Sequence, residues 1–339
     1  MVGRRATLRV DVLQLGRRAM QWLAVAAATV VLAACATQDV ARNASSERGA
    51  AGERVLVPLQ VITGGRLAPG LDASGLPALR SPAALTSFIH PAAVALAGGD
   101  FYIADTGARR VYRLDTALST MAAVPGAPVA LETRLAVGDD LSLYVLDPAQ
   151  RRVLRLSRQA RPLASYSDGA NLVRPVALAV DDAHGEVFVA DQVLNLLVAF
   201  HPLGNAREII SMRGDERNRV MNITAFALGA GAIHISDALC RCVQVVDRAG
   251  YARASFGHGD LGQPGAIAID RHGRVLVTDQ FHNSIKIFAA GRLVHEVAGR
   301  ALGVVQITDL AVREDRLVVA DGPGARVVVL RIAAPQGTH

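Results

Sequence analysis

The sequence predicts an all-β protein built from repeats, and three features carry this prediction. An aspartate at the end of an apolar run recurs six times, in steps of 42, 44, 46, 42 and 42 residues, and self-similarity at such a period indicates a repeat architecture. These residues, called the blade aspartates below, are Asp105, Asp147, Asp191, Asp237, Asp279 and Asp321. Short apolar runs separated by Gly, Pro and Asp favour strands, and the expected folded part shows no helical periodicity.

Each repeat resolves into strands, most clearly in the segment 264–288. The first strand has an alanine between two large apolar residues, as in Ile267-Ala268-Ile269. The other copies of this alanine are Ala95, Ala136, Ala179, Ala227 and Ala311. A small side chain at one fixed position suits strands that crowd around an axis. The second strand ends at the blade aspartate, the third is the alternating run after it, and a weaker fourth follows in several repeats.

The ends of the repeat region predict how the ring closes. The last repeat stops at Ile332 after its third strand, and an unpaired apolar segment, Val55–Ile62, precedes the first repeat. This segment is the natural fourth strand of the last blade, and it would remove the open edge. Pro58 within it suits an outermost strand. We therefore expect a six-bladed β-propeller over residues 54–332, with a short tail at 333–339.

The N-terminal region predicts export. Residues 1–35 combine an arginine-rich start with an apolar run, Trp22–Ala34, which is short for a membrane span and typical of a cleaved signal. Its ending, Leu32 to Cys35, resembles the bacterial lipobox, which implies diacylglycerol on Cys35 and a membrane partner. Ala36 after the cysteine favours, by that resemblance, the outer membrane facing the periplasm. Residues 36–53 are expected to be a flexible tether.

The charge does not indicate nucleic-acid binding. The whole chain carries +6, but residues 1–34 hold five arginines and one acid, so +4 belongs to the expected signal and +2 remains. The basic character that would suggest nucleic acid is mostly removed with the signal.

The repeats resemble the NHL repeat, in which a proline and a Gly-Ile-Ala-Val-like strand precede Val-Ala-Asp and a polar turn. The segment 264–270 with Val277-Thr278-Asp279 is the best copy, and 175–181 with Val189-Ala190-Asp191 also matches. The resemblance covers residues 85–332 and implies a propeller, a fold that hosts binding modules, scaffolds and a few enzymes. The blade aspartates are expected to be structural, accepting amides of the next turn.

Two sets of residues are candidates for a binding site at one end of the channel. The position five residues before each axial alanine is polar in five repeats, and a ring of polar groups over a concavity is a default binding site. It holds His90, Leu131, Arg174, Asn222, Gln263 and Gln306. The turns after the blade aspartates add cations that suit an anionic ligand, namely Arg109, Arg110, Arg151, Arg152, Arg241, His282, Asn283 and Arg326, counting Asn283 as their polar neighbour. The alternative for both sets is an ordinary solvated surface. The turns at the other end, such as Gly98-Gly99, are short and expected to offer little chemistry.

The remaining motifs leave function broad. Cys240 and Cys242 could form a disulfide, stay as thiols or bind metal, and one Cys-x-Cys is weak support for metal. No catalytic triad order, zinc signature, phosphate loop or haem motif occurs in the sequence. We therefore expect a lipid-anchored envelope module, without cofactor, that binds a protein or an anionic ligand. The alternatives are a hydrolase or lyase with its site at the channel mouth, and a structural part of an envelope complex.

Overall fold

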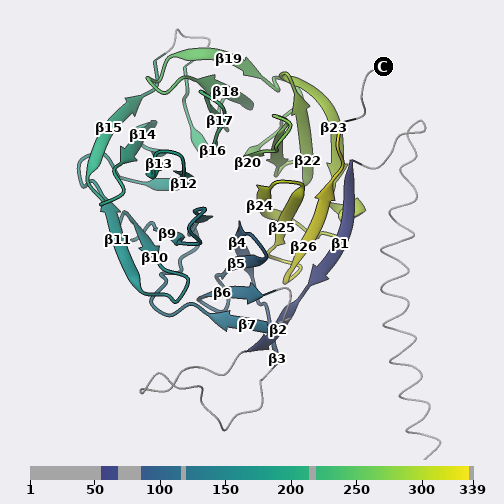
Figure 1. The fold of residues 1–339 in the computed structure, drawn as a ribbon. Helices are drawn as coiled ribbons and strands as arrows, with labels where there is room; N and C mark the ends of the chain where they lie inside the picture. The colour runs from purple at the N-terminus through teal and green to yellow at the C-terminus, as the bar shows by residue number, and fades with distance from the viewer. Residues whose placement is uncertain (1–54, 68–84, 116–119, 214–218, 336–339) are drawn as a thin grey trace, which may run out of the picture. The chain divides into compact units, whose positions relative to one another are not determined.

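The six-bladed propeller is confirmed by the computed structural model, which describes residues 55–67, 85–115, 120–213 and 219–335. Five sheets have four strands and one has six, and each sheet is one blade. Figure 1 shows β4, β12, β16, β20 and β24 around the centre and β7, β11, β15, β19, β23 and β1 at the rim. The one described helix is a short 3₁₀ turn, η1 (Gly299–Leu302).

The strands follow the order that the repeats predict, from the axis outward. The first three blades consist of β4 (Pro91–Ala97), β5 (Asp100–Asp105), β6 (Arg110–Asp115) and β7 (Thr120–Ala123); of β8 (Leu135–Val137), β9 (Leu143–Asp147), β10 (Arg152–Leu156) and β11 (Pro162–Ser167); and of β12 (Pro175–Asp181), β13 (Glu186–Asp191), β14 (Leu196–Phe200) and β15 (Ala206–Ser211). The next two consist of β16 (Ile223–Leu228), β17 (Ile233–Asp237), β18 (Cys242–Val246) and β19 (Ala252–Phe256), and of β20 (Pro264–Ile269), β21 (Val275–Asp279), β22 (Ser284–Ala289) and β23 (Arg292–Ala298). The last blade consists of β24 (Ile307–Arg313), β25 (Arg316–Asp321), β26 (Arg326–Ile332) and the N-terminal β1 (Leu56–Ile62). A fourth strand is therefore present in every blade, including those whose sequence showed it weakly.

The ring closes as the sequence predicts. β1 pairs antiparallel with β26, from Leu56 opposite Ile332 to Ile62 opposite Val327. The register shifts between Pro58 and Gln60, which is where a residue without an amide hydrogen interrupts the ladder. Both ends of the repeat region thus lie in one blade.

The segment after β1 adds a second clasp that the sequence did not indicate. β2 (Gly64–Leu67) pairs in parallel with β7, and β3 (Leu85–Ser87) pairs with β2, so the first blade has two extra outer strands. The N-terminal chain therefore runs along the outside of both the last and the first blade. At the crossing point a Cβ on Gly64 would lie 2.0 Å from the carbonyl oxygen of Thr86, so the glycine is required there.

Side-chain alternation on the inner strands joins each blade to both neighbours. On β4, Val94 and Leu96 pack with Val318 and Val327 of the last blade, whereas the axial Ala95 packs with Leu143 of the second blade. The core is therefore a series of apolar layers between blades, and the alanines let the inner strands approach around the axis.

The expected signal, the lipidation at Cys35 and the tether lie outside the described residues. Among the described residues, no helix is long and apolar enough to cross a membrane.

Candidate functional site

The blade aspartates are structural, as predicted, and they do more than the sequence suggested. Asp191 accepts the amides of Val193 and Leu194 in the turn after it, and also those of Val173 and Arg174 in the loop before the inner strand. The aspartates of the first, fourth, fifth and last blades join the same two segments: Asp105, Asp237, Asp279 and Asp321. In these five blades one buried carboxylate thus fixes two surface segments, whereas Asp147 of the second blade accepts the amide of Gln150 in the turn after it.

Hydrogen bonds set the acidity of two of these carboxyls. Burial alone would raise the pKa of Asp279, but the amide of Gly262 and the side chains of His282 and Lys286 outweigh it and hold the pKa well below its usual range. For Asp321, burial is likewise outweighed, chiefly by Arg326, and its pKa is lowered. Both stay ionised at neutral pH, as acceptors of several N–H groups must.

The predicted ring and the predicted turns lie at the same end of the propeller. The amides of Thr106, Gln192, Ala238 and Gln280, each directly after a blade aspartate, donate to the carbonyls of His90, Arg174, Asn222 and Gln263. We call this end the mouth face. It comprises the loops 88–90, 124–134, 168–174, 219–222, 257–263 and 299–306 and the turns 106–109, 148–151, 192–195, 238–241, 280–283 and 322–325.

The side chains of the predicted ring do not act as one set. Arg174 and Gln263 line the central cavity, and Glu132, Gln192 and Gln280 join them. His90 instead bonds Thr106 through Nδ1, and Asn222 accepts a hydrogen bond from Gln192. Gln306 and Leu131 are exposed outside the cavity lining.

The one arginine of the predicted ring, Arg174, already has a carboxylate partner. Its Nη2 lies 2.7 Å from Oε1 of Glu132, and both side chains are about half exposed. The hydrogen bond that Arg174 donates to Glu132 raises the pKa of Arg174. An incoming anion would have to compete with this pair, so Arg174 is a weaker candidate than its sequence position suggests.

The predicted turn cations divide into paired and unpaired ones. Arg152 and Arg326 lie beside Asp147 and Asp321, and His282 bonds Asp279 at 2.7 Å. Four exposed arginines make no ion pair with any described residue, namely Arg109, Arg110, Arg151 and Arg241. These four are among the cations that the mouth face offers to an outside group.

Three of the unpaired arginines have an unfavourable backbone. Arg109, Arg151 and Arg241 have φ of 54°, 50° and 54°, in the left-handed region, which costs an ordinary residue about 1–2 kcal/mol. The third and fifth blades place an asparagine there, the residue that tolerates this region best after glycine. These are Asn195 and Asn283.

The asparagines also connect blades, and this explains where they occur. Asn283 donates to the carbonyl of Val305 and accepts the amide of Ile307, both at 2.9 Å. Asn195 accepts the amide of Ile223 at 3.4 Å. In the blades that follow Arg151 and Arg241, the residue equivalent to these isoleucines is a proline, which has no amide hydrogen to donate. In the blade that follows Arg109, the equivalent residue is Glu132, which does have an amide hydrogen.

The mouth face also exposes apolar side chains, which the sequence did not lead us to predict. Of the seventeen large hydrophobic residues that are exposed in the described chain, nine lie on it: Ile89, Leu131, Val173, Val193, Leu194, Met221, Leu239, Phe281 and Val305. All except Leu131 donate their backbone amide to a blade aspartate. The available signal was their position, next to the ring residue or just after the aspartate. The apolar side chains are therefore held outward on a fixed backbone.

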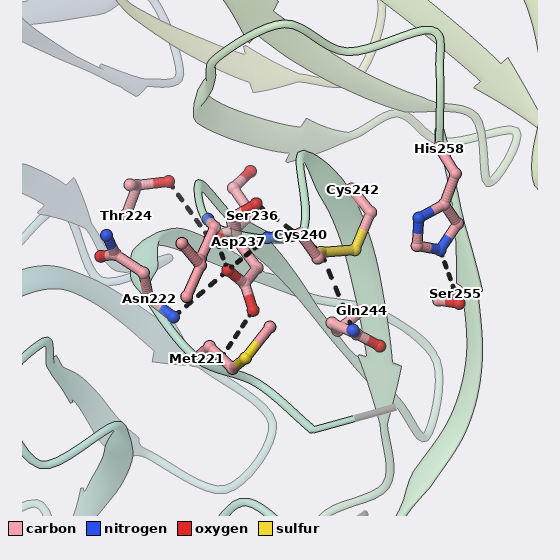
Figure 2. Close-up of a disulfide and its surroundings, with 11 residues drawn as sticks. Met221, Asn222, Thr224, Ser236, Asp237, Cys240, Cys242, Gln244, Ser255 and His258 are labelled. Carbon is pink, nitrogen blue, oxygen red and sulfur yellow. Dashed lines mark hydrogen bonds between the residues drawn. A yellow bond between two sulfur atoms is a disulfide. The ribbon is translucent and has the colours of Figure 1, made fainter. Parts of the chain in front are cut away.

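The cysteine pair, left open by the sequence, is a disulfide in this structure. Cys240 and Cys242 are bonded, with their Cα atoms 5.3 Å apart because the chain turns between them, which is within the usual range. Figure 2 shows the disulfide beside Asp237, whose carboxylate accepts the amides of Met221 and Asn222. The bond closes the turn that presents Leu239 and Arg241 on the mouth face.

A cavity of about 460 Å³ lies on the axis and is lined by the inner strands of all six blades. Its walls are mostly Ala, Val, Leu and Ile, with the polar residues named above at the mouth and Arg134, Thr224, Thr308, Asp309 and Arg313 deeper or toward the other end. No group of three or more His, Cys, Asp or Glu suited to a metal ion occurs in the described part of the chain.

The end away from the mouth corrects the expectation that it offers little chemistry. It carries a dense set of ion pairs, several of which join different blades. Arg158 of the second blade bonds Asp100 of the first at 2.8 Å, and Arg248 of the fourth bonds Asp181 and Glu186 of the third. We call this end the opposite face. It comprises the turns 98–99, 138–142, 182–185, 229–232, 270–274 and 314–315 and the turns 157–161, 201–205, 247–251 and 290–291.

Comparisons with known proteins agree on the fold. No protein-family model and no curated protein matches the chain. A protein of unknown function from Bacteroides thetaiotaomicron has a similar structure, with TM-score 0.61 and 14% identity over 80% of this chain and 76% of that one. Virginiamycin B lyase from Staphylococcus aureus gives 0.56 and 10% over 72% and 96%. The WD40 propeller domain of Doa1 gives 0.53 and 9% over 84% and 98%. Folds of this kind serve both catalysis and binding, so function has to be argued from the site.

Proposed function

We propose that this protein is a recognition module of the cell envelope that docks a protein partner on its mouth face. The observation that carries the proposal is the concentration of exposed apolar side chains there. Exposed apolar groups that gather on one surface, with polar groups around them, mark interaction sites. On the opposite face, the turns expose only Leu203 and Tyr251 among the large hydrophobic residues described.

The partner surface is expected to be apolar with acidic groups at its edge. Among the four unpaired arginines, Arg241 lies in the same turn as the exposed Leu239, so an acidic side chain on the partner would meet there a guanidinium that has no competing described carboxylate. Arginine in such a place suits bidentate pairing with a carboxylate. Because the blade aspartates hold the backbone, docking requires little ordering of these turns, which favours affinity.

The location of the module rests on the sequence. The lipobox-like ending at Cys35 supports lipid attachment at a membrane surface. Cys35→Ala should block lipidation and release the protein from the membrane fraction. If the variant precursor is processed normally and stays membrane-bound, the anchor is wrong.

The docking proposal is tested by affinity capture from envelope extract with three versions of the protein. The unaltered protein should retain one dominant protein. The double variant Leu131→Ser, Leu239→Ser should lose it, because these two residues are 83% and 63% exposed, respectively, on the mouth face. Leu203→Ser, 87% exposed on the opposite face, is the matched control and should retain the partner. Equal retention by all three versions, or loss with Leu203→Ser, would contradict docking at this face.

A further inference from the structure

One level of the axial cavity differs between blades. The residue two positions before the axial alanine is itself alanine in four blades, namely Ala93, Ala177, Ala225 and Ala266. In the second and last blades it is Arg134 and Asp309. Both line the cavity. The repeat therefore folds with alanine at this level, and the two charged residues are departures that the architecture does not require.

Asp309 is a buried carboxylate without an ion pair among the described residues. It is 7% exposed, lies in the middle of β24, and its Oδ2 accepts the amide of Val94 on the neighbouring inner strand at 3.0 Å. Burial raises its pKa to about 6, against the opposing effects of Arg134 and of the amides of Val94 and Leu310. A buried charge of this kind is costly unless something pairs with it.

Arg134 is the cation whose charge acts on Asp309, but the two side chains form no ion pair. Its Nη1 donates to its neighbour's carbonyl, that of Thr133, at 3.2 Å. Its charge acts on Asp309 strongly enough to lower the pKa of that carboxyl, yet no nitrogen and oxygen of the two groups come within 4.0 Å. The cavity thus presents an acceptor and a cationic donor that are close but unpaired, between apolar walls.

We propose that the axial cavity binds a small zwitterion, with its ammonium group at Asp309 and its carboxylate at Arg134. A ligand that carries only one charge would leave the other protein group unpaired in a low-dielectric channel. A zwitterion pairs both at once, and its carbon chain would contact the alanine, valine and isoleucine walls. The volume of about 460 Å³ lies in the range of small-molecule sites. This site is independent of partner docking on the mouth face.

The proposal is tested with a series of ω-amino acids from glycine to 6-aminohexanoate, titrated into the purified full-length protein by calorimetry. Hexylamine and hexanoate serve as single-charge controls. One chain length should bind best, because only one length spans the gap, and it should bind about 10- to 100-fold more tightly than either control, the usual effect of one charged hydrogen bond. Zwitterions that bind no better than the single-charge controls, or that do not bind, would overturn the proposal.

Two variants assign the binding to this level of the cavity. Asp309→Asn and Arg134→Gln should each reduce the affinity of the best ω-amino acid to that of the single-charge controls. Glu314→Gln and Arg271→Gln remove the same two kinds of charge from exposed residues of the opposite face, and they should leave the affinity unaltered. Thermal melts accompany the titrations, because four blades fold with alanine here and Asp309→Asn should melt no lower than the unaltered protein at pH 7.5. Binding that survives both cavity variants, or variants that lose binding only by unfolding, would contradict the assignment.

Discussion

The two faces of the propeller use arginine in opposite ways. On the opposite face arginines pair with acids, often of another blade, as Arg158 does with Asp100 and Arg313 with Asp139. On the mouth face the blade aspartates are buried and accept amides, Arg174 pairs with Glu132, and arginines such as Arg109 and Arg241 stay exposed in a costly backbone conformation. The opposite face therefore contributes to holding blades together, whereas the mouth face gives up stability to present apolar and cationic groups.

The largest expected effect is at a buried ion pair behind the opposite face. Nε of Arg274 lies 2.6 Å from Asp270, both side chains are at most 7% exposed, and Nη2 donates to the carbonyl of Ala333 beyond β26. Arg274→Ala would leave Asp270 buried and unpaired, so we expect a loss of about 3–5 kcal/mol in the free energy of unfolding. Urea unfolding measures it, with the exposed Arg271→Ala as control. Equal losses in the two variants would mean that this pair does not stabilise the fold.

The next-largest expected effect is at the axis, where, unlike at either face, the stability of the fold should depend on pH through Asp309. The pKa of Asp309 is about 6 in the folded protein against 3.8 as the reference value. Between these values only the folded state keeps the proton, so this group lowers stability as pH rises from about 4 to above 6, by about 3 kcal/mol in total. Asp309→Asn keeps an oxygen for Val94 and removes the charge, so it should be more stable than the unaltered protein at pH 7.5 and equal to it near pH 4.

The charged groups close enough to Asp309 to affect this pH dependence can be named. Arg134 is the one charged side chain that affects the pKa of Asp309. β4 and β20, which pack against β24, contain no titratable residue, and on β21 and β25 the charged residues Asp279, Arg316 and Asp321 lie at the strand ends. A stability difference between Asp309→Asn and the unaltered protein that stays constant from pH 4 to 7.5 would show that Asp309 is not the titrating group.

A smaller effect compares two mouth-face arginines. Arg109→Asn relieves the left-handed backbone and gains a possible acceptor for the amide of Glu132, so it should stabilise by about 1–2 kcal/mol. Arg151→Asn relieves the same strain but faces Pro175, which has no amide, and should stabilise by about half as much. Thermal unfolding of both variants checks the order. Destabilisation by both would mean that these arginines support the fold and are not held there for an outside partner.

The sequence predicted most of the fold because its period repeats a physical requirement. The axial alanine and the blade aspartate each mark one place per blade, and Ile332 ending on a third strand left one strand to be found in Val55–Ile62. β2 and β3 could not be found this way. β2 is four residues long, begins with two glycines, and pairs with β7 in parallel, so neither alternation nor a hairpin turn indicates it.

The candidate site was predicted less well, because residue type does not tell where a side chain turns. His90 and Asn222 are polar at the expected position but bond to Thr106 and Gln192, and Arg174 pairs with Glu132. Arg274 follows a polar turn just before β21, where the sequence suggests a surface position, but its side chain is buried against Asp270. These contacts depend on which residues of neighbouring segments lie close together in space, and the sequence pattern does not contain that information.

The decisive measurement for docking on the mouth face is the dissociation constant of the captured partner with the Phe281→Ser variant. Phe281 is 75% exposed on the mouth face, its backbone amide donates to Asp279 and its ring makes one edge contact with the half-exposed His282, so the change should lower the melting temperature little. We expect the dissociation constant to rise at least about tenfold, since a well-placed aromatic side chain commonly anchors an interface. Val294→Ser, 45% exposed on the outer strand β23, should leave it unchanged. An unchanged dissociation constant for Phe281→Ser, or an equal rise for Val294→Ser, would contradict the claim that the mouth face is the docking surface.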